Sequence, residues 1–303
     1  MTGFIASSTA LATSLMRAVH TRLDPDPLID DPWGERLVPE SVREAFRQFV
    51  LAKMDSDSRA KASASPDSIL DTALRTNAAY AGVIIRARYT EDALKAAVAN
   101  GIRQYAIIGA GFDSFALRRP AFAREVDVYE IDHPATQGLK CQRLRECGLS
   151  LTESVHFIAA DLAEEDLGTA LARSPFRLND PAFFSWLGVT TYLTREANLA
   201  TLRAIATCGA PGSELVFTYI DEREFNSGSD SGSFHEVKTA AASVGERWVS
   251  GFDPEKIAEY LQRSGLILEE DLNGEQMAER YRRTGVNSLR PPATSHIARA
   301  RVG

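Results

Sequence analysis

Residues 104–114 read Gln104-Tyr-Ala-Ile-Ile-Gly109-Ala-Gly111-Phe-Asp113-Ser, and a second apolar run with an acidic tip, Val126-Asp-Val-Tyr-Glu130-Ile-Asp132, follows a short helical pattern. Strand, glycine-rich turn, helix, strand and acid in this order form the first half of a nucleotide-binding α/β domain. Glycines without a Cβ let the backbone turn tightly and approach a ligand. A carboxylate at the tip of the second strand is placed to bind ribose hydroxyls. The pattern therefore predicts a nucleoside-containing cofactor.

From residue 104 onward, apolar runs of strand length alternate with helical patterns. Strands are expected at 104–109, 126–131, 154–159, 182–188 and 213–220, and helices at 113–119, 134–147, 164–173 and 194–207. The tail adds an expected helix at 253–264 and expected strands at 266–268 and 295–302. Near-continuous apolar strands that alternate with helices indicate a parallel sheet covered on both faces. We therefore predict an α/β fold with a doubly wound, mostly parallel sheet.

The first hundred residues have a different pattern, with helices expected at 7–20, 41–54 and 68–99. The predicted division is a helical cap or lid over residues 1–100 and a Rossmann-like domain over 101–303, with an insert at about 221–250. Small polar residues at 55–67 and the serine- and glycine-rich stretch 227–233 predict mobile surface loops.

Composition narrows the class of function. The 303 residues are 44% hydrophobic and 25% charged, as in an ordinary globular protein, and the net charge of −7 argues against a nucleic-acid surface. The three cysteines have no metal-binding spacing, so no metal site is expected and a reducing cytoplasm is favoured. Neither a signal peptide nor a membrane-spanning helix is expected.

Two cofactors fit the glycine-rich turn. A dinucleotide requires Gly-x-Gly-x-x-Gly/Ala, but the third position is Ser114, and no tyrosine has the lysine four residues later that short-chain dehydrogenases need. S-adenosylmethionine has no pyrophosphate, so the third glycine is dispensable. It needs a partner for adenine after the third strand, where Asp161 stands. Acids at 130, 132 and 161 therefore favour S-adenosylmethionine.

The chain resembles the S-adenosylmethionine-dependent methyltransferases of the leucine carboxyl methyltransferase superfamily, in particular the branch abundant in actinobacteria. The resemblance spans nearly the whole chain and implies a class I methyltransferase fold. The stretches that carry it are Ser8-Thr-Ala-Leu11 with Arg17-Ala-Val-His20, Leu28-Ile-Asp-Asp-Pro32, Arg86-Ala-Arg-Tyr89 with Asp92, Gln104 to Asp113, Tyr129-Glu-Ile-Asp-His-Pro134 with Gln137 and Lys140, Ala160-Asp-Leu162, Phe184-Ser-Trp-Leu-Gly-Val-Thr-Thr-Tyr-Leu193 and Trp248-Val-Ser-Gly-Phe-Asp-Pro254.

The resemblance also implies roles for particular residues. Asp132 is expected to contact the ribose, with Glu130 as the rival, and Asp161 with Leu162 to frame the adenine. The turn Gly109-Ala110-Gly111 is expected under the methionine part of the cofactor. Arg86, with Arg88 as the alternative, is expected to pair with the cofactor carboxylate, a task that suits a guanidinium. The chain departs from the family at Leu187, where the family usually carries an acid that touches the cofactor.

Methyl transfer from a sulfonium is a direct displacement that needs alignment and exclusion of water. Tyr192 is the candidate that orients the acceptor, or else a core tyrosine. His133 and His235 are the candidate bases, with a helix cap as the alternative for His133. The expected acceptor is a small molecule methylated on a carboxylate or hydroxyl oxygen. Three alternatives stay open: a protein C-terminal carboxyl methyltransferase, a nicotinamide-dependent oxidoreductase and a non-catalytic cofactor-binding protein. The sequence also leaves a homo-oligomer open.

Overall fold

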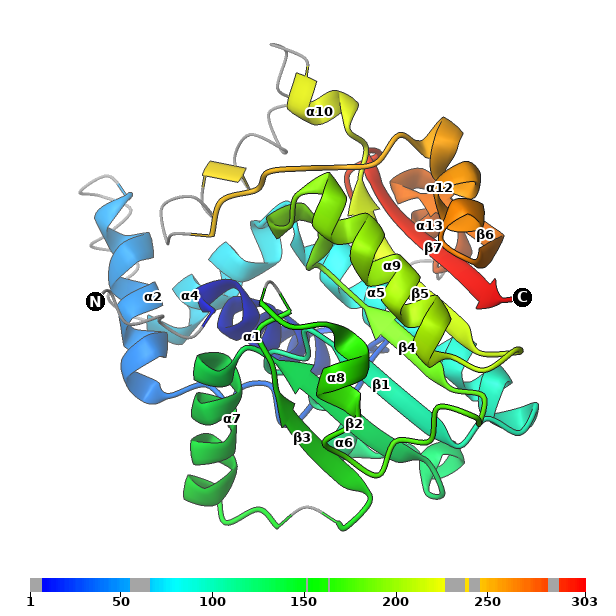
Figure 1. Cartoon of the computed structure of the whole chain (residues 1–303). Helices are drawn as coiled ribbons and strands as arrows, with labels where there is room; N and C mark the ends of the chain where they lie inside the picture. Colours follow the sequence, from blue (N-terminus) through cyan, green and yellow to red (C-terminus); the bar gives the residue numbers. More distant parts are fainter. Residues whose placement is uncertain are drawn as a thin grey trace.

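The computed structural model describes residues 7–54, 66–150, 152–162, 164–226, 238–239, 246–282 and 289–303. Its centre is a seven-stranded sheet with the spatial order β3-β2-β1-β4-β5-β7-β6 (Figure 1). The strands are β1 (Gln104–Ile108), β2 (Asp127–Asp132), β3 (Val155–Ala159), β4 (Phe183–Trp186), β5 (Glu214–Ile220), β6 (Leu266–Asn273) and β7 (Ser295–Val302).

Strands β1 to β5 are parallel, whereas β7 runs antiparallel to β5 and to β6. β1 lies between β2 and β4, so the strand order reverses direction there. In open α/β sheets, ligands bind beyond the carboxyl ends of the strands at such a reversal. The predicted doubly wound, mostly parallel sheet is confirmed, and its topology places the glycine-rich turn after β1 at the expected binding edge.

Helices cover both faces of the sheet. One hydrophobic cluster joins α1 and α5 to the sheet, and a second joins α8, α9 and α12 to its other face. In Figure 1, α8 and α9 cross in front of the strands and α5 lies behind them. The helices of four or more residues are α1 (Ser8–Leu23), α2 (Glu40–Ala52), α4 (Pro66–Thr76), α5 (Tyr80–Ala99), α6 (Phe115–Arg118), α7 (Pro134–Glu146), α8 (Leu167–Leu171), α9 (Arg195–Cys208), α10 (Arg223–Asn226), α12 (Ile257–Arg263) and α13 (Gly274–Arg280).

Three local predictions differ from the structure. The helix expected over 68–99 is broken into α4 and α5, because the Asn77 side chain accepts a hydrogen bond from the Ala79 amide and turns the chain. The strand expected at 266–268 extends to Asn273, although its second half is polar. The carboxylate of Glu269 forms ion pairs with Arg299 and Arg301 of the neighbouring strand β7. Helix α13 was not foreseen.

Most of the two expected mobile loops lies outside the described residues, apart from Pro66 and Asp67 in α4. The division at residue 100 and the insert at 221–250 stay predictions. The helices α1 and α5 and the strands of the sheet share one hydrophobic cluster.

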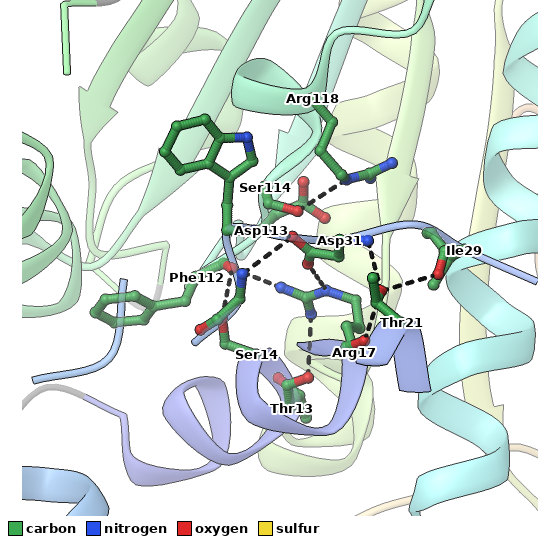
Figure 2. Close-up of polar contacts among 12 residues, drawn as sticks. Thr13, Ser14, Arg17, Thr21, Ile29, Asp31, Phe112, Asp113, Ser114 and Arg118 are labelled. Atoms are coloured by element: carbon green, nitrogen blue, oxygen red, sulfur yellow. Dashed lines mark hydrogen bonds and ion pairs between the residues drawn. The ribbon is translucent and has the colours of Figure 1, made fainter. Parts of the chain in front are cut away.

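Helix α1 is fastened to the glycine-rich turn by a buried guanidinium. Arg17 Nη2 donates to the Phe112 carbonyl at 2.6 Å, and Arg17 Nε donates to Asp31 Oδ2 at 2.8 Å. Figure 2 shows the guanidinium between these two partners, with the Thr13 carbonyl below. Ser14 also donates to the Phe112 carbonyl, at 3.4 Å. Helix α1 therefore holds the turn after β1 in place.

Asp31 organises the segment that follows α1. It is fully buried, and its Oδ1 accepts from the amides of Trp33 and Gly34 at 3.1 and 3.0 Å. Burial alone would raise the pKa of Asp31, but the charges of Arg17 and Arg118 and a hydrogen bond with Ser114 lower it. The carboxylate is thus charged in the folded protein and joins the N-terminal segment to residues that flank the turn.

We expect Asp31→Asn to lower the free energy of unfolding at pH 7 by about 3 kcal/mol, because Arg17 stays buried without its counter-ion. Asp30→Asn, at the exposed neighbouring position, is the control, and it should lower the free energy of unfolding by less than about 0.5 kcal/mol. The folded pKa of Asp31 lies below its unfolded value, so this stability is present above about pH 4 and is lost as the pH falls. Urea unfolding should show that the difference in unfolding free energy between wild type and Asp31→Asn narrows as the pH falls below about 4. A difference that widens would contradict the assignment.

Candidate functional site

The glycine-rich turn is shaped by the protein's own atoms. Gly109 and Gly111 have φ angles of +69° and +52°, which other residues rarely adopt. A Cβ on Gly109 would lie 2.4 Å from Val189 Cγ2, and one on Gly111 would lie 2.9 Å from the Ala10 Cβ. The amides of Gly109 and Ala110 donate to the Ile131 carbonyl, at 2.9 and 3.2 Å. Packing as well as conformation therefore requires both glycines.

Asp132 ends β2 directly beside this turn. Its Oδ2 accepts the Gly111 amide and its Oδ1 accepts the His133 amide at 2.6 Å. Burial raises the pKa of Asp132, and these two amides oppose that rise. The carboxylate is half-buried and held in a fixed orientation at the carboxyl end of the strand.

Asp161 and Leu162 follow β3, the neighbour of β2 in the sheet. Asp161 Oδ2 lies 3.7 Å from His133 Nε2, so His133 contacts both predicted acids, Asp132 through its backbone amide and Asp161 through its ring. His133 Nδ1 accepts the Ala135 amide at 3.2 Å and thereby caps α7. The structure brings the predicted ribose and adenine residues to neighbouring strand ends, and it gives His133 a structural role.

Glu130 is enclosed in the protein, with 1% of its surface exposed. Its carboxylate accepts from Lys140 Nζ, which also donates to the Asp113 carbonyl at 2.6 Å. Burial raises the pKa of Glu130 to about 7, and the Lys140 charge opposes the rise. Through Lys140, this pair holds Asp113, which follows the glycine-rich turn. Because Glu130 is enclosed and paired whereas Asp132 is half-buried at the strand end, the geometry favours Asp132 as the residue that faces a ligand.

Arg86 projects from α5 into a cavity. The described residues offer its guanidinium neither a hydrogen bond nor an ion pair, whereas Arg88 pairs with Asp92 at 2.8 Å. Burial, with the nearby charge of Arg17, lowers the pKa of Arg86 to about 10. A Cβ on Gly188 would lie 2.5 Å from Arg86 Nη1. The segment after β4 therefore lies directly against a cation that has its hydrogen-bonding capacity free for a ligand.

Tyr192 and Leu187 lie on the same segment but in different surroundings. Tyr192 lines the cavity with its ring edge-to-face against Trp248, the ring centroids 6.5 Å apart, and burial raises its pKa. Leu187 packs at the edge of the first hydrophobic cluster. His235, the other candidate base, lies outside the described residues.

The cavity has a volume of about 700 Å³ and extends from the sheet to the N-terminal helices. Arg86, Gly188 and Tyr192 belong to its wall, whereas Gly109, Asp132 and Asp161 do not. The sequence analysis did not identify the lining from α2, although the four-residue spacing of Val42, Phe46 and Val50 is typical of an apolar helix face. It also missed the Arg17–Asp31 pair, because the two residues become partners only when the helix and the loop fold together.

Lys140→Met should lower the free energy of unfolding by about 3–5 kcal/mol, because Glu130 is left buried without its counter-ion and the Asp113 carbonyl loses a donor. The double variant Lys140→Met/Glu130→Gln should regain most of that loss. Chemical denaturation measures both, and Lys95→Met on an exposed helix position is the matched control. Equal stability of Lys140→Met and Lys95→Met would refute the structural role of the pair.

The sequence model described as "Leucine carboxyl methyltransferase" matches residues 10–206. A protein of Bacillus subtilis named "Putative S-adenosyl-L-methionine-dependent methyltransferase YktD" is 31% identical over 307 residues, covering 97% of each chain. A Mycobacterium ulcerans protein named "Putative S-adenosyl-L-methionine-dependent methyltransferase" is 31% identical over 255 residues, covering 82% of this chain and 72% of its own.

Among solved structures, the crystal structure titled as a "putative methyltransferase from Thermobifida fusca" has the same fold, with a TM-score of 0.59 and 13% identity over 99% of this chain and 96% of that chain. Within the described ranges, no helix has the length and apolar character needed to cross a membrane, and no cluster of three or more potential ligands could hold a metal ion. The nicotinamide alternative gives way to the family match. The chain belongs to the leucine carboxyl methyltransferase family of S-adenosylmethionine-dependent methyltransferases.

Proposed function

We propose that this methyltransferase binds S-adenosylmethionine at the carboxyl ends of β1 to β4 and methylates a carboxylate or hydroxyl oxygen of a small molecule. The observation that carries the proposal is the guanidinium of Arg86. It projects into the cavity beside Gly188, and the described residues leave it without a hydrogen bond or an ion pair. A half-buried guanidinium without a counter-ion is costly, so its retention favours an anionic ligand.

The described side chains fit the cofactor. Arg86 would hold its carboxylate, Asp132 its ribose hydroxyls, and Asp161 with Leu162 its adenine; the turn Gly109 to Gly111 would lie below its methionine part. When bound, the cofactor supplies an electrophilic methyl group on sulfur. Leu187 offers an apolar side chain where the family usually has an acid, so the proposed site relies on Arg86, Asp132 and Asp161 for its charged contacts.

The protein's own contribution to the reaction is alignment and exclusion of water. Tyr192 lies at the wall of the cavity with its ring against that of Trp248, and its hydroxyl can orient an acceptor oxygen there. A carboxylate acceptor needs no base, whereas a hydroxyl acceptor has to lose its proton. His235 remains the proposed base for that second case. A protein C-terminal carboxylate is the alternative acceptor.

Calorimetric titration tests the cofactor site. We expect the wild type to bind S-adenosylmethionine and not NAD, and Asp132→Ala to weaken that binding about 10- to 100-fold, since a charge-assisted hydrogen bond contributes about 1.5–3 kcal/mol. Thermal unfolding of each variant verifies that the fold is retained. Binding of NAD alone, or of neither ligand, would overturn the proposal.

Two glycines with nearly equal backbone angles provide a test of Arg86. Gly188 and Gly148 have φ angles of +68° and +67°. A Cβ added at Gly188 would clash with Arg86, whereas a Cβ added at Gly148 would lie in open space. Gly188→Ala and Gly148→Ala should therefore each lose about 1–2 kcal/mol of stability. Only Gly188→Ala should displace the guanidinium and weaken S-adenosylmethionine binding, by about tenfold. Equal affinities in the two variants would show that Arg86 does not hold the cofactor.

A further inference from the structure

The cavity next to Arg86 has a long apolar part formed by the N-terminal helices. α2 contributes one whole face to it, yet none of its side chains is buried. Phe49 is 48% exposed although it belongs to the cavity wall. The apolar residues that line this part are Leu11, Met16, Val42, Ala45, Phe46, Phe49, Val50, Leu70, Leu74 and Val83. A helix face of this kind is left open to a space that an apolar ligand would fill.

The other end of the cavity is polar but almost without charge. Hydroxyl groups come from Thr190, Thr191 and Tyr192 after β4, and from Thr218 and Ser295 at the ends of β5 and β7. Among the described residues that line the cavity, Asp, Glu and Lys are absent, and Arg86 is the one side chain with a permanent charge. The Glu246 carboxylate lies outside this wall and accepts the Thr9 amide at 3.2 Å. The described side chains of the wall itself therefore offer an ammonium group no counter-ion, whereas a hydroxyl or a carboxyl group would find donors and acceptors.

The dimensions of the space are those of an acceptor site. Pockets for small molecules occupy about 300–1,000 Å³, and this one has about 700 Å³. The residues proposed for ribose and adenine lie outside its wall, so most of the volume is available to a second molecule. The polar end is the end that adjoins Gly188 and Arg86, next to the proposed position of the methyl donor.

We propose that the acceptor is an amphipathic molecule with a long alkyl chain, whose terminal carboxyl or hydroxyl group lies at the threonine and tyrosine hydroxyls and whose chain lies between α1, α2 and α4. This inference rests on the proposed function for the identity of the reaction. It goes beyond that function in naming the chemical class of the acceptor. The transferred methyl group forms a bond to the acceptor oxygen as its bond to sulfur breaks, leaving S-adenosylhomocysteine and, from a hydroxyl acceptor, a proton.

The test is a titration of saturated fatty acids from hexanoate to dodecanoate, and of the matching primary alcohols, into the wild type with and without S-adenosylmethionine. Trp248 lies in the cavity wall, so its fluorescence reports occupancy beside calorimetry. Burial of each added methylene should raise the affinity about fourfold until the chain fills the cavity. Methyl ester or ether formed from the best ligand is then measured by mass spectrometry.

Two variants and a matched control assign the binding to the cavity. Phe49→Ser, at a half-exposed position, and Phe46→Ser should each weaken dodecanoate binding about tenfold and reduce the dependence on chain length. Leu178→Ser removes a side chain that is 47% exposed and lies outside the cavity wall, and it should change nothing. S-adenosylmethionine affinity should be the same in all three variants.

The outcomes separate the two proposals. Affinity that does not rise with chain length, or that is equally weakened by Leu178→Ser, would overturn the alkyl-chain inference while S-adenosylmethionine binding upholds the proposed function. Chain-length-dependent binding without S-adenosylmethionine binding would uphold the cavity's ligand class and overturn the proposed reaction. Methylation of a C-terminal peptide in place of any alkyl compound would also overturn the inference.

Discussion

The contact between the Arg17 guanidinium and the Phe112 carbonyl joins the helical N-terminal region to the sheet at the point where the proposed cofactor site begins. The turn that contains Phe112 has two glycines with positive φ, and it is covered by Ala10 from α1 and by Val189 from the segment after β4. Asp31 keeps the guanidinium in place and is itself held by backbone amides. The shape of the turn therefore depends on residues nearly one hundred positions earlier in the sequence.

Charges around this turn are paired in a consistent way. Arg17 pairs with Asp31, Arg118 with Glu91, and Lys140 with Glu130, each with both partners largely shielded from solvent. Such pairs are expensive to break but contribute little net stability relative to apolar residues, so they are best understood as fixing geometry. Arg86 differs from these cations because the described residues give it no counter-ion. Among the described residues, Arg86 thus stands apart from the paired cations of this region, which supports the anionic ligand proposed for it.

The parallel core could be predicted from the sequence because buried strands are continuous apolar runs and each of the five was located to within two residues. Features that depend on individual side-chain contacts could not be predicted in this way. The break at Asn77 comes from one side-chain hydrogen bond inside an otherwise helical pattern. The second half of β6 is polar, and its pairing with β7 becomes visible only when the arginines of β7 lie opposite. Sequence spacing left Glu130 and Asp132 as rivals for the proposed ribose contact. In the structure Glu130 is buried and faces Lys140, whereas Asp132 is half-buried at the end of its strand.

The same reasoning explains why the sequence indicates the cofactor more readily than the acceptor. Groups proposed for the cofactor lie at strand ends, where short motifs have a fixed relation to the sheet, so Asp132 and Asp161 could be named in advance. The cavity proposed for the acceptor is built from faces of α1, α2 and α4 together with strand ends far apart in the chain. In the sequence, the α2 face with Phe46 has the spacing of an ordinary packing face. Only the folded arrangement shows that it borders an open volume, so the proposed class of acceptor rests on the shape and lining of that volume.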